Sequence, residues 1–206
     1  MKIRSLAVLP VLALACLGLT GCDSKAGSAA VVNGTKISES DLASYLTANA
    51  QPVTSTDGNG NSTTTPPKIF VLQYLVRNQI FALLLANAGS PVTQAQLDAG
   101  RTAALSGTND ANLTNQITGL GLKPKFEDVV VRDRELLDLI QANGKLTSNA
   151  QITAALANVK NAVSINPRYG SWNSMTVAVV DLSKKQLPSV LTLNTTLPGD
   201  ETVPTG

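Results

Sequence analysis

The apolar stretch at residues 68–87 constrains the fold more than any other part of this chain. Its apolar side chains would stand on nearly every side of a helix, and a helix of that kind is buried in a protein core or spans a membrane. Arg77, Asn78 and Gln79 interrupt the stretch near its middle, and an arginine at the centre of a bilayer costs on the order of 2.5 kcal/mol or more. We therefore predict a buried central helix, with a membrane segment as the alternative.

Helix start and stop signals place further helices on both sides of this central one. In a capping box, a Ser or Thr side chain and an acid or amide three residues later bond each other's backbone N–H groups. Such boxes begin at Ser38, Thr93 and Ser148. The predicted helices cover 38–50, 93–105, 110–120 and 125–143, and a last one begins at 148.

Short strands are predicted near both ends of the folded part of the chain. Asn33-Gly34 is a favoured pair for a two-residue hairpin turn, because both residues tolerate positive φ, and it divides the apolar run at 29–37. Apolar and polar residues alternate at 163–166, and 175–180 is rich in β-branched residues. Strands this short need partners, so we expect the two chain ends to pair in one small sheet beneath the helices.

The predicted fold class is therefore mainly α with a small β-sheet, in one domain that covers residues 29–181. Within this domain, 51–67 is rich in Thr, Ser, Asn, Gly and Pro, and it offers too little apolar surface to offset the entropy of ordering it. We predict a disordered loop there. Residues 182–206 show no clear period and are expected to form a flexible tail.

The N-terminus carries the pattern of an export signal. Lys2 and Arg4 precede an apolar run at 7–19, which is too short to span a bilayer but long enough for the core of a signal peptide. The run ends in Leu-Thr-Gly-Cys at 19–22, which resembles the lipobox of bacterial lipoproteins. In that motif a signal peptidase cuts before the cysteine once its thiol carries diacylglycerol.

The lipobox resemblance implies a processing pathway and a location. It implies a lipoprotein signal peptide over 1–21, a lipid on Cys22, and a short polar tether over 22–28. Several acyl chains on one residue make a stable anchor, since each buried methylene contributes about 0.8 kcal/mol. We expect the protein at the outer, extracytoplasmic face of the cell membrane. An ordinary secretory signal that is cut elsewhere is the alternative.

Composition argues against several classes of function. The chain has no histidine, and its two cysteines are Cys16, inside the proposed signal, and Cys22. The folded part would then have no free thiol, no disulfide, and neither the commonest general base nor the commonest metal ligand. Loss of Lys2 and Arg4 with the signal leaves 14 basic against 14 acidic residues, which gives no electrostatic footprint for nucleic acid. We expect no nucleic-acid partner, no cofactor and no metal site.

The acidic residues do not form a catalytic pattern either. The stretch 125–143 is the best amphipathic helix of the chain, and its acids alternate with arginines, as on the ordinary charged face of a helix. No phosphate-binding loop, dinucleotide fingerprint or nucleophile elbow occurs, so we expect no catalytic residue and no enzyme. The acids in question are Glu127, Asp128, Asp133 and Glu135, and the expected i,i+4 pairs are Asp128 with Arg132 and Arg134 with Asp138.

Two segments resemble a known family. Residues 30–42 read AVVNGTKISESDL and residues 163–172 read VSINPRYGSW. They are similar to the opening and closing segments of the SurA N-terminal-like domain, as found in a periplasmic chaperone and in lipoproteins of actinobacteria. The resemblance implies a helical domain closed by a returning strand, which holds unfolded or extended polypeptide. No parvulin domain fits between 152 and 166, so prolyl isomerase activity is not implied.

Two hypotheses about function follow. The first is a membrane-anchored chaperone of the holdase type, which binds unfolded exported polypeptides in an apolar groove between helices. The second is a structural or assembly lipoprotein that binds one specific partner at the envelope. An uncovered cleft beside the central helix would favour the first. The candidate groove residues are aromatic, although residues of this kind more often pack in the core: Tyr45, Tyr74, Tyr169 and Trp172.

Overall fold

The computed structural model describes residues 27–56, 60, 62–105, 110–146, 148–173 and 178–180. These residues are mostly helical with small antiparallel sheets, which confirms the predicted fold class at that level. The proposed signal peptide, Cys22 and the proposed tail at 182–206 lie outside the described residues. What the sequence predicts for them therefore stays a prediction.

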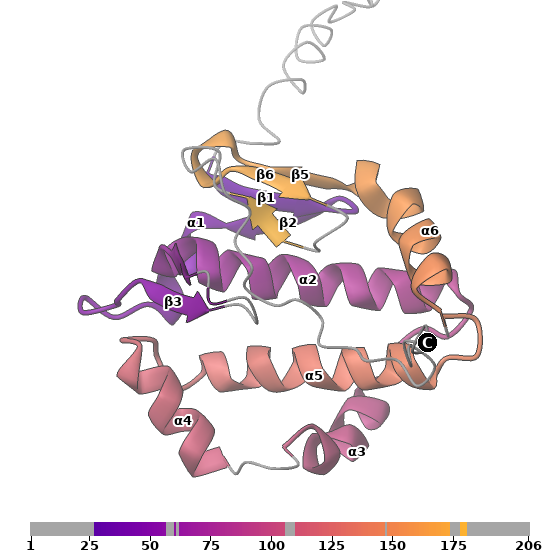
Figure 1. The fold of residues 1–206 in the computed structure, drawn as a ribbon, viewed down its shortest axis with the longest axis horizontal. Helices are drawn as coiled ribbons and strands as arrows, with labels where there is room; N and C mark the ends of the chain where they lie inside the picture. Colours follow the sequence, from indigo (N-terminus) through magenta and orange to yellow (C-terminus); the bar gives the residue numbers. More distant parts are fainter. Residues whose placement is uncertain are drawn as a thin grey trace, which may run out of the picture.

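The central helix, α2 (Pro67–Asn87), lies between a small sheet on one side and helix α5 (Phe126–Ala142) on the other (Figure 1). Its core-facing side chains include Val71, Leu72, Val76 and Ile80, all 0% exposed. By length and composition alone α2 could cross a membrane, but 67% of its most apolar window is buried inside the domain. The prediction of a buried central helix is confirmed.

The sheet joins the two ends of the folded part, as predicted. Its strand order is β2 (Thr35–Ser38), β1 (Ser28–Val32), β5 (Val163–Ile165), and every pairing is antiparallel. Asn33 and Gly34 form the turn between β1 and β2 with φ of 47° and 81°. The proposed tether ends one residue too late, because Ser28 already pairs with Ser38 in the sheet.

Helix α1 (Glu39–Tyr45) is shorter than predicted. The capping box of Ser38 and Asp41 is present, but Leu46 is extended instead of helical. Leu46 N still donates to Ala43 O at 3.2 Å, but beyond it the chain bonds to the backbone near Gly121: Thr47 N donates to Gly121 O at 3.0 Å, and Lys123 N donates to Tyr45 O at 2.8 Å. These long-range bonds replace the last helical turns.

The predicted disordered loop is wrong for most of its length. Strands β3 (Val53–Thr56) and β4 (Ser62–Thr65) form an antiparallel hairpin, whose tip at 57–59 and 61 lies outside the described residues. Threonine has a high strand propensity, and the facing hydroxyls of Thr54 and Thr64 bond each other at 3.1 Å. Thr65 is 3% exposed. The cross-strand pairs and the buried end at Thr65 stabilise this hairpin, although it has few apolar residues to bury.

The remaining helices match the sequence signals closely. They are α3 (Gln94–Ala104), α4 (Asp110–Gly119), α5 and α6 (Asn149–Val159), and the predicted capping boxes open α3 and α6. Helices α3 and α4 lie against α5 on the side away from α2 (Figure 1). The described helices and the β1 sheet thus form stacked layers, in the order sheet, α2, α5, then α3 and α4.

The C-terminal part of the domain differs from the expected single sheet. After two short 3₁₀ turns (Lys160–Ala162 and Pro167–Tyr169), β6 (Ser171–Asn173) pairs antiparallel with β7 (Ala178–Val180) in a separate two-stranded sheet. Gly170, with φ of 113°, turns the chain between β5 and β6. A side chain strains this conformation, and the turn separates the strand at 178–180 from the β1 sheet.

Candidate functional site: a groove between α2 and α5

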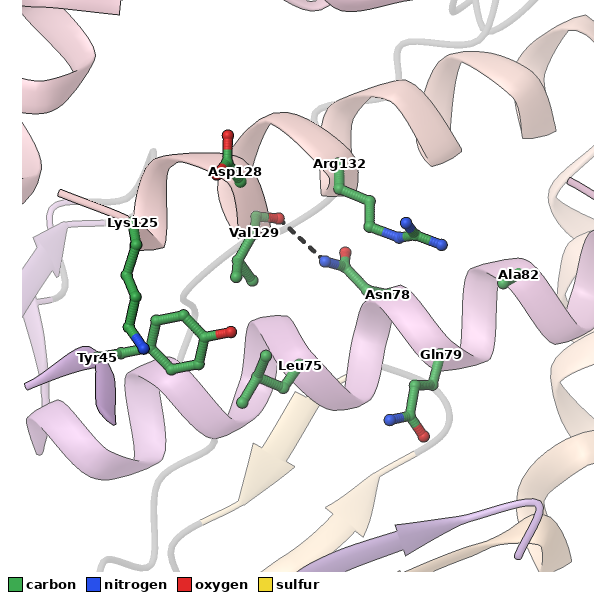
Figure 2. A pocket seen from close by; sticks show the side chains of 9 residues that line it. All are labelled: Tyr45, Leu75, Asn78, Gln79, Ala82, Lys125, Asp128, Val129 and Arg132. Atoms are coloured by element: carbon green, nitrogen blue, oxygen red, sulfur yellow. Dashed lines mark hydrogen bonds between the residues drawn. The ribbon is translucent and has the colours of Figure 1, made fainter. Parts of the chain in front are cut away.

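An open groove of about 530 Å³ lies between α2 and α5 (Figure 2). Four of its lining residues come from α2, three come from α5, one is the residue that caps α5, and the ninth closes one end. We call this feature the α2/α5 groove. Its lining residues are Tyr45 from α1, Leu75, Asn78, Gln79 and Ala82 from α2, and Lys125, Asp128, Val129 and Arg132 from the start and first turns of α5.

The same spacing recurs on both walls of the groove. The α2 residues stand at 75, 78, 79 and 82 and the α5 residues at 125, 128, 129 and 132, so each set follows the pattern i, i+3, i+4, i+7. This pattern places side chains on one face of a helix. Both faces are mixed, because each wall combines aliphatic residues with polar or charged ones.

A polar bridge crosses the groove at its centre. Asn78 Nδ2 donates to Val129 O at 3.0 Å, which fixes the orientation of the amide because the carbonyl can only accept. The other end, Asn78 Oδ1, is buried and has no hydrogen-bond partner, and Gln79 Oε1 shares that state. Leaving a buried acceptor unpaired costs about 1–3 kcal/mol. Figure 2 shows Gln79 directed away from α5, so Asn78 Oδ1 is the acceptor beside the groove that a bound donor would satisfy.

Cationic side chains border the groove. Lys125 Nζ lies 4.7 Å from the centre of the Tyr45 ring, and the exposed Arg132 side chain projects from α5 toward Asn78 (Figure 2). Burial, followed by the carboxylates of Asp41 and Asp128, raises the pKa of Tyr45, so its hydroxyl stays a donor at the end of the groove. Within the described residues, Arg132 forms no ion pair.

The predicted i,i+4 ion pairs on α5 are wrong, because these side chains turn to other helices. Asp128 pairs with Arg101 of α3 at 3.3 Å, and Figure 2 shows its carboxylate directed away from α2. Arg134 donates to the carbonyl of Ala104, the last residue of α3, at 3.2 Å. Tertiary partners that hold α3 against α5 thus replace partners on the same helix.

Beside the groove, the same two helices are sealed by a buried ion pair. Arg77 binds Asp133 through both ends of its guanidinium, with Nε 2.5 Å from Oδ1, and the two residues are 7% and 4% exposed. The guanidinium carbon also lies 4.8 Å from the Tyr74 ring centre and 5.8 Å from that of Phe81. Burial raises the pKa of Asp133, against the opposing effect of Arg77.

The expectation that the α5 acids form an ordinary exposed face is therefore wrong in part. Asp133 and Glu135 are buried, at 4% and 7% exposed. Glu127 is bound by Arg101 at 3.0 Å and by Thr114 of α4. Asp133 and Glu127 thus fasten neighbouring helices to α5, and none of the three acids lines the groove.

The aromatic candidates from the sequence fall mostly outside the groove. Tyr45 lines it. Tyr74 packs edge-on against Phe70 and Phe126, Tyr169 is 5% exposed and donates to Glu39, and Trp172 packs against the core. Sequence reasoning missed Asn78 and Arg132 as groove residues, although the repeated i, i+3, i+4, i+7 spacing is visible in the sequence.

The groove offers side chains for hydrogen bonds, ionic contacts and apolar contacts. The described residues contain no cluster of three or more His, Cys, Asp or Glu side chains that could hold a metal ion. The proposed lipidation site, Cys22, lies outside them.

Comparisons of the chain with models of protein families, with curated proteins and with solved structures found no match.

Proposed function

We propose that the protein is a membrane-anchored lipoprotein whose helical domain binds unfolded or extended exported polypeptides as a holdase. The observation that carries the proposal is the α2/α5 groove, which stays open beside the central helix where a closed core would argue against such binding. Its volume of about 530 Å³ falls within the range of ligand sites, roughly 300–1,000 Å³. It accommodates a short segment of a client rather than a folded domain.

The polar groups of the groove suit a polypeptide backbone. An extended chain presents unpaired N–H and C=O groups along its length, and the groove offers the acceptor Asn78 Oδ1 together with the donors Lys125 and Arg132. Leu75 and Val129 supply apolar surface for side chains. Because peptide backbone is common to all clients, such contacts favour broad and reversible binding.

The resemblance to the SurA N-terminal-like domain supports the same proposal. The similar segment at 30–42 forms β1, β2 and the start of α1, and the similar segment at 163–172 begins with β5. The two segments meet in one sheet, where Val32 pairs with Val163. This pairing agrees with a returning strand that closes the domain, as the resemblance implies.

The anchor is proposed on the sequence alone. A lipid on Cys22 would be separated from β1, which begins at Ser28, by a spacer that reaches at most about 20 Å when fully extended. The groove would then work close to the outer face of the membrane. Here emerging exported chains are still unfolded.

Substitution of the proposed lipid-bearing cysteine tests the anchor. We expect Cys22→Ser to abolish processing and to move the protein out of the membrane fraction, as measured by fractionation and by the mass of the mature chain. Cys16→Ser is the matched control, since that residue would be removed with the signal. A Cys22→Ser variant with unchanged processing and unchanged membrane association would overturn the lipoprotein assignment.

An aggregation assay tests the holdase activity. The purified full-length protein, kept in detergent, should slow the aggregation of a chemically unfolded exported protein, as followed by light scattering. Leu75→Gln places a polar group on the groove wall and should weaken this effect several-fold. Leu83→Gln is the control, because Leu83 is also half-buried on α2 but does not line the groove. Equal loss in both variants, or no effect of the wild type, contradicts the proposal.

The β3–β4 hairpin favours a second candidate, a structural or assembly lipoprotein with one specific partner. The hairpin is paired in register and carries exposed polar side chains at Thr54 and Thr56, and its outer edges can accept a partner strand. A pull-down from envelope extracts separates the two candidates. One stoichiometric folded partner favours the assembly role, whereas many sub-stoichiometric clients favour the holdase.

A further inference from the structure

We infer that the α2/α5 groove selects client segments in which acidic residues flank a short apolar run. This inference rests on the function proposed above and names the chemistry of its clients. The groove combines an apolar floor with cations at separate places along one wall, Lys125 near Tyr45 and Arg132 above Asn78 (Figure 2). A segment with carboxylates at both flanks would match this arrangement.

The balance of charge around the groove supports the inference. Arg132 is exposed and has no ion-pair partner among the described residues. The nearby carboxylates are Asp128, Asp41 and Glu135, and none of them forms an ion pair with Lys125 or Arg132 among the described residues, although Glu135 interacts electrostatically with Arg132 and Asp41 with Lys125. Asp128 pairs with Arg101 at 3.3 Å, and Asp41 accepts from Ser38 N at 2.8 Å. These carboxylates offset part of the positive charge, but the exposed guanidinium of Arg132 stays open to ion pairing with a client carboxylate.

The buried amide of Asn78 is a second, independent sign that a ligand belongs here. Asn78 is 7% exposed, and its Oδ1 has no partner while its Nδ2 is held by the Val129 carbonyl. A donor is needed at that position, and a peptide N–H provides one. Acidic side chains alone would not satisfy this oxygen, so the amide favours a polypeptide over a small anion.

The spacing of the cations defines the client segment. Lys125 and Arg132 are two helical turns apart, which is about 10 Å along α5. In an extended chain, residues i and i+4 point to the same side and are about 13 Å apart, and the long Lys and Arg side chains cover the difference. The favoured segment therefore has acids at i and i+4, with apolar residues between them.

Lys125 should contribute less than Arg132 to this selectivity. Its ammonium already lies over the Tyr45 ring at 4.7 Å and interacts electrostatically with Asp41, whose pKa is lowered first by hydrogen bonds from Ser38 and then by this lysine. A client carboxylate near Lys125 shares the cation with these groups. A client carboxylate near Arg132 meets a guanidinium that has no ion-pair partner among the described residues, although it interacts electrostatically with Glu135.

The experiment uses labelled peptides that share a Val-Leu-Val centre and differ only at the flanking positions i and i+4, which are Glu, Gln or Lys. Binding to the full-length protein in detergent is measured by fluorescence anisotropy. We expect the Glu peptide to bind about threefold to tenfold more tightly than the Gln peptide, as two exposed ion pairs allow. The Lys peptide should bind most weakly, and the differences should shrink in high salt.

Charge reversal identifies the residue responsible. Arg132→Glu should remove or invert the preference for the Glu peptide, while Lys160→Glu, an exposed change of the same charge outside the groove, should leave it intact. Equal affinity for the three peptides, or a preference that survives Arg132→Glu, overturns the inference while the holdase stands. If no peptide binds and aggregation is not slowed, both the inference and the proposed function fail.

Discussion

Arg77 and Asn78 are neighbours on α2, and both are 7% exposed, yet their polar groups are in opposite situations. Arg77 has Asp133 at both ends of its guanidinium and aromatic rings around it. Asn78 has one partner, the Val129 carbonyl, and its Oδ1 has none. Successive helical residues point about 100° apart, so one lies within the sealed part of the α2 and α5 interface and the other beside the groove.

The difference separates polar groups that maintain the fold from one that is available to a ligand. A buried charge without a partner is strongly unfavourable, so a sealed ion pair must be complete. A buried amide with one free acceptor is tolerable, and it gains from a bound donor. The two residues therefore predict different consequences of substitution, and the following variants test this contrast.

The largest effect is expected from breaking the sealed pair. Arg77→Met leaves the Asp133 carboxylate buried without a partner and should lower the free energy of unfolding by about 3–5 kcal/mol. Replacing both residues, Arg77→Met with Asp133→Leu, should restore most of this stability, because two apolar side chains can fill the space. Urea denaturation measures both. A double variant as unstable as the single one would mean that the pair does more than avoid an unpaired charge.

A smaller effect is expected at Gly121, whose carbonyl accepts from Thr47 N in the segment that follows Tyr45. Its φ is +71°, and an added Cβ would lie 2.4 Å from Asn49 O. Gly121→Ala should cost about 2–3 kcal/mol through strain and displaced backbone. It should also weaken client binding, since the bond from Lys123 N to Tyr45 O positions this end of the groove.

Gly144 provides the control for that substitution. It follows α5, its φ is not positive, and a Cβ there would meet nothing within 4 Å. Gly144→Ala should change the free energy of unfolding by no more than about 0.5 kcal/mol and leave client binding unchanged. Similar losses in both variants would show that the tight approach at Gly121 is not what holds the groove end.

A second complete polar pair, Tyr169 with Glu39, should contribute to stability in a pH-dependent way. Burial, followed by the hydrogen bond to Glu39, raises the pKa of Tyr169 to about 12 from its ordinary value of 10.0. Because the folded state holds the proton more tightly, this contribution is complete below pH 10 and is lost as the pH rises through about 12. Tyr169→Phe should cost about 1–2 kcal/mol at neutral pH.

The same variant isolates the pH effect from that of the other tyrosines. Burial also raises the pKa values of Tyr45 and Tyr74, but both remain in Tyr169→Phe. The loss of stability between pH 10 and 12 should therefore be shallower in Tyr169→Phe than in the wild type when urea denaturation is repeated across this range. Parallel curves would contradict the role of this hydroxyl.

The smallest effect on stability is expected at Asn78. Asn78→Leu removes the bond to Val129 O but also removes the unpaired Oδ1, so the free energy of unfolding should change by no more than about 1 kcal/mol. Client binding should weaken, because the acceptor for a peptide N–H is lost. A loss of stability comparable to that of Arg77→Met would place Asn78 with the structural pairs and remove the contrast.

The helices and the terminal strands could be predicted because their signals are local. Thr93 with Gln96 and Ser148 with Gln151 form the capping boxes that their spacing indicates, and Asn33-Gly34 forms the expected turn. The β3–β4 hairpin was missed because it depends on Thr54 and Thr64 pairing with each other from opposite strands. Composition alone does not contain that register.

The candidate site could be predicted only in part. The recurring spacing at 75–82 and 125–132 is present in the sequence, and Tyr45, one of the four aromatic candidates, does line the groove. The ion-pair partners were not predictable from the sequence. Asp133 lies 56 residues from Arg77, and Asp128 pairs with Arg101 of α3 instead of with Arg132 on its own helix. Each choice depends on how the helices pack, which is a property of the whole domain.

By itself the sequence determined which segments are helical, that α2 is buried, and that the domain lacks histidine, since these follow from local pattern and composition. Only the tertiary structure decided that Arg77 is sealed while Asn78 borders an open groove. The physical reason is that adjacent residues on one helix face different neighbours. Which neighbours these are is set by the distant chain that packs there.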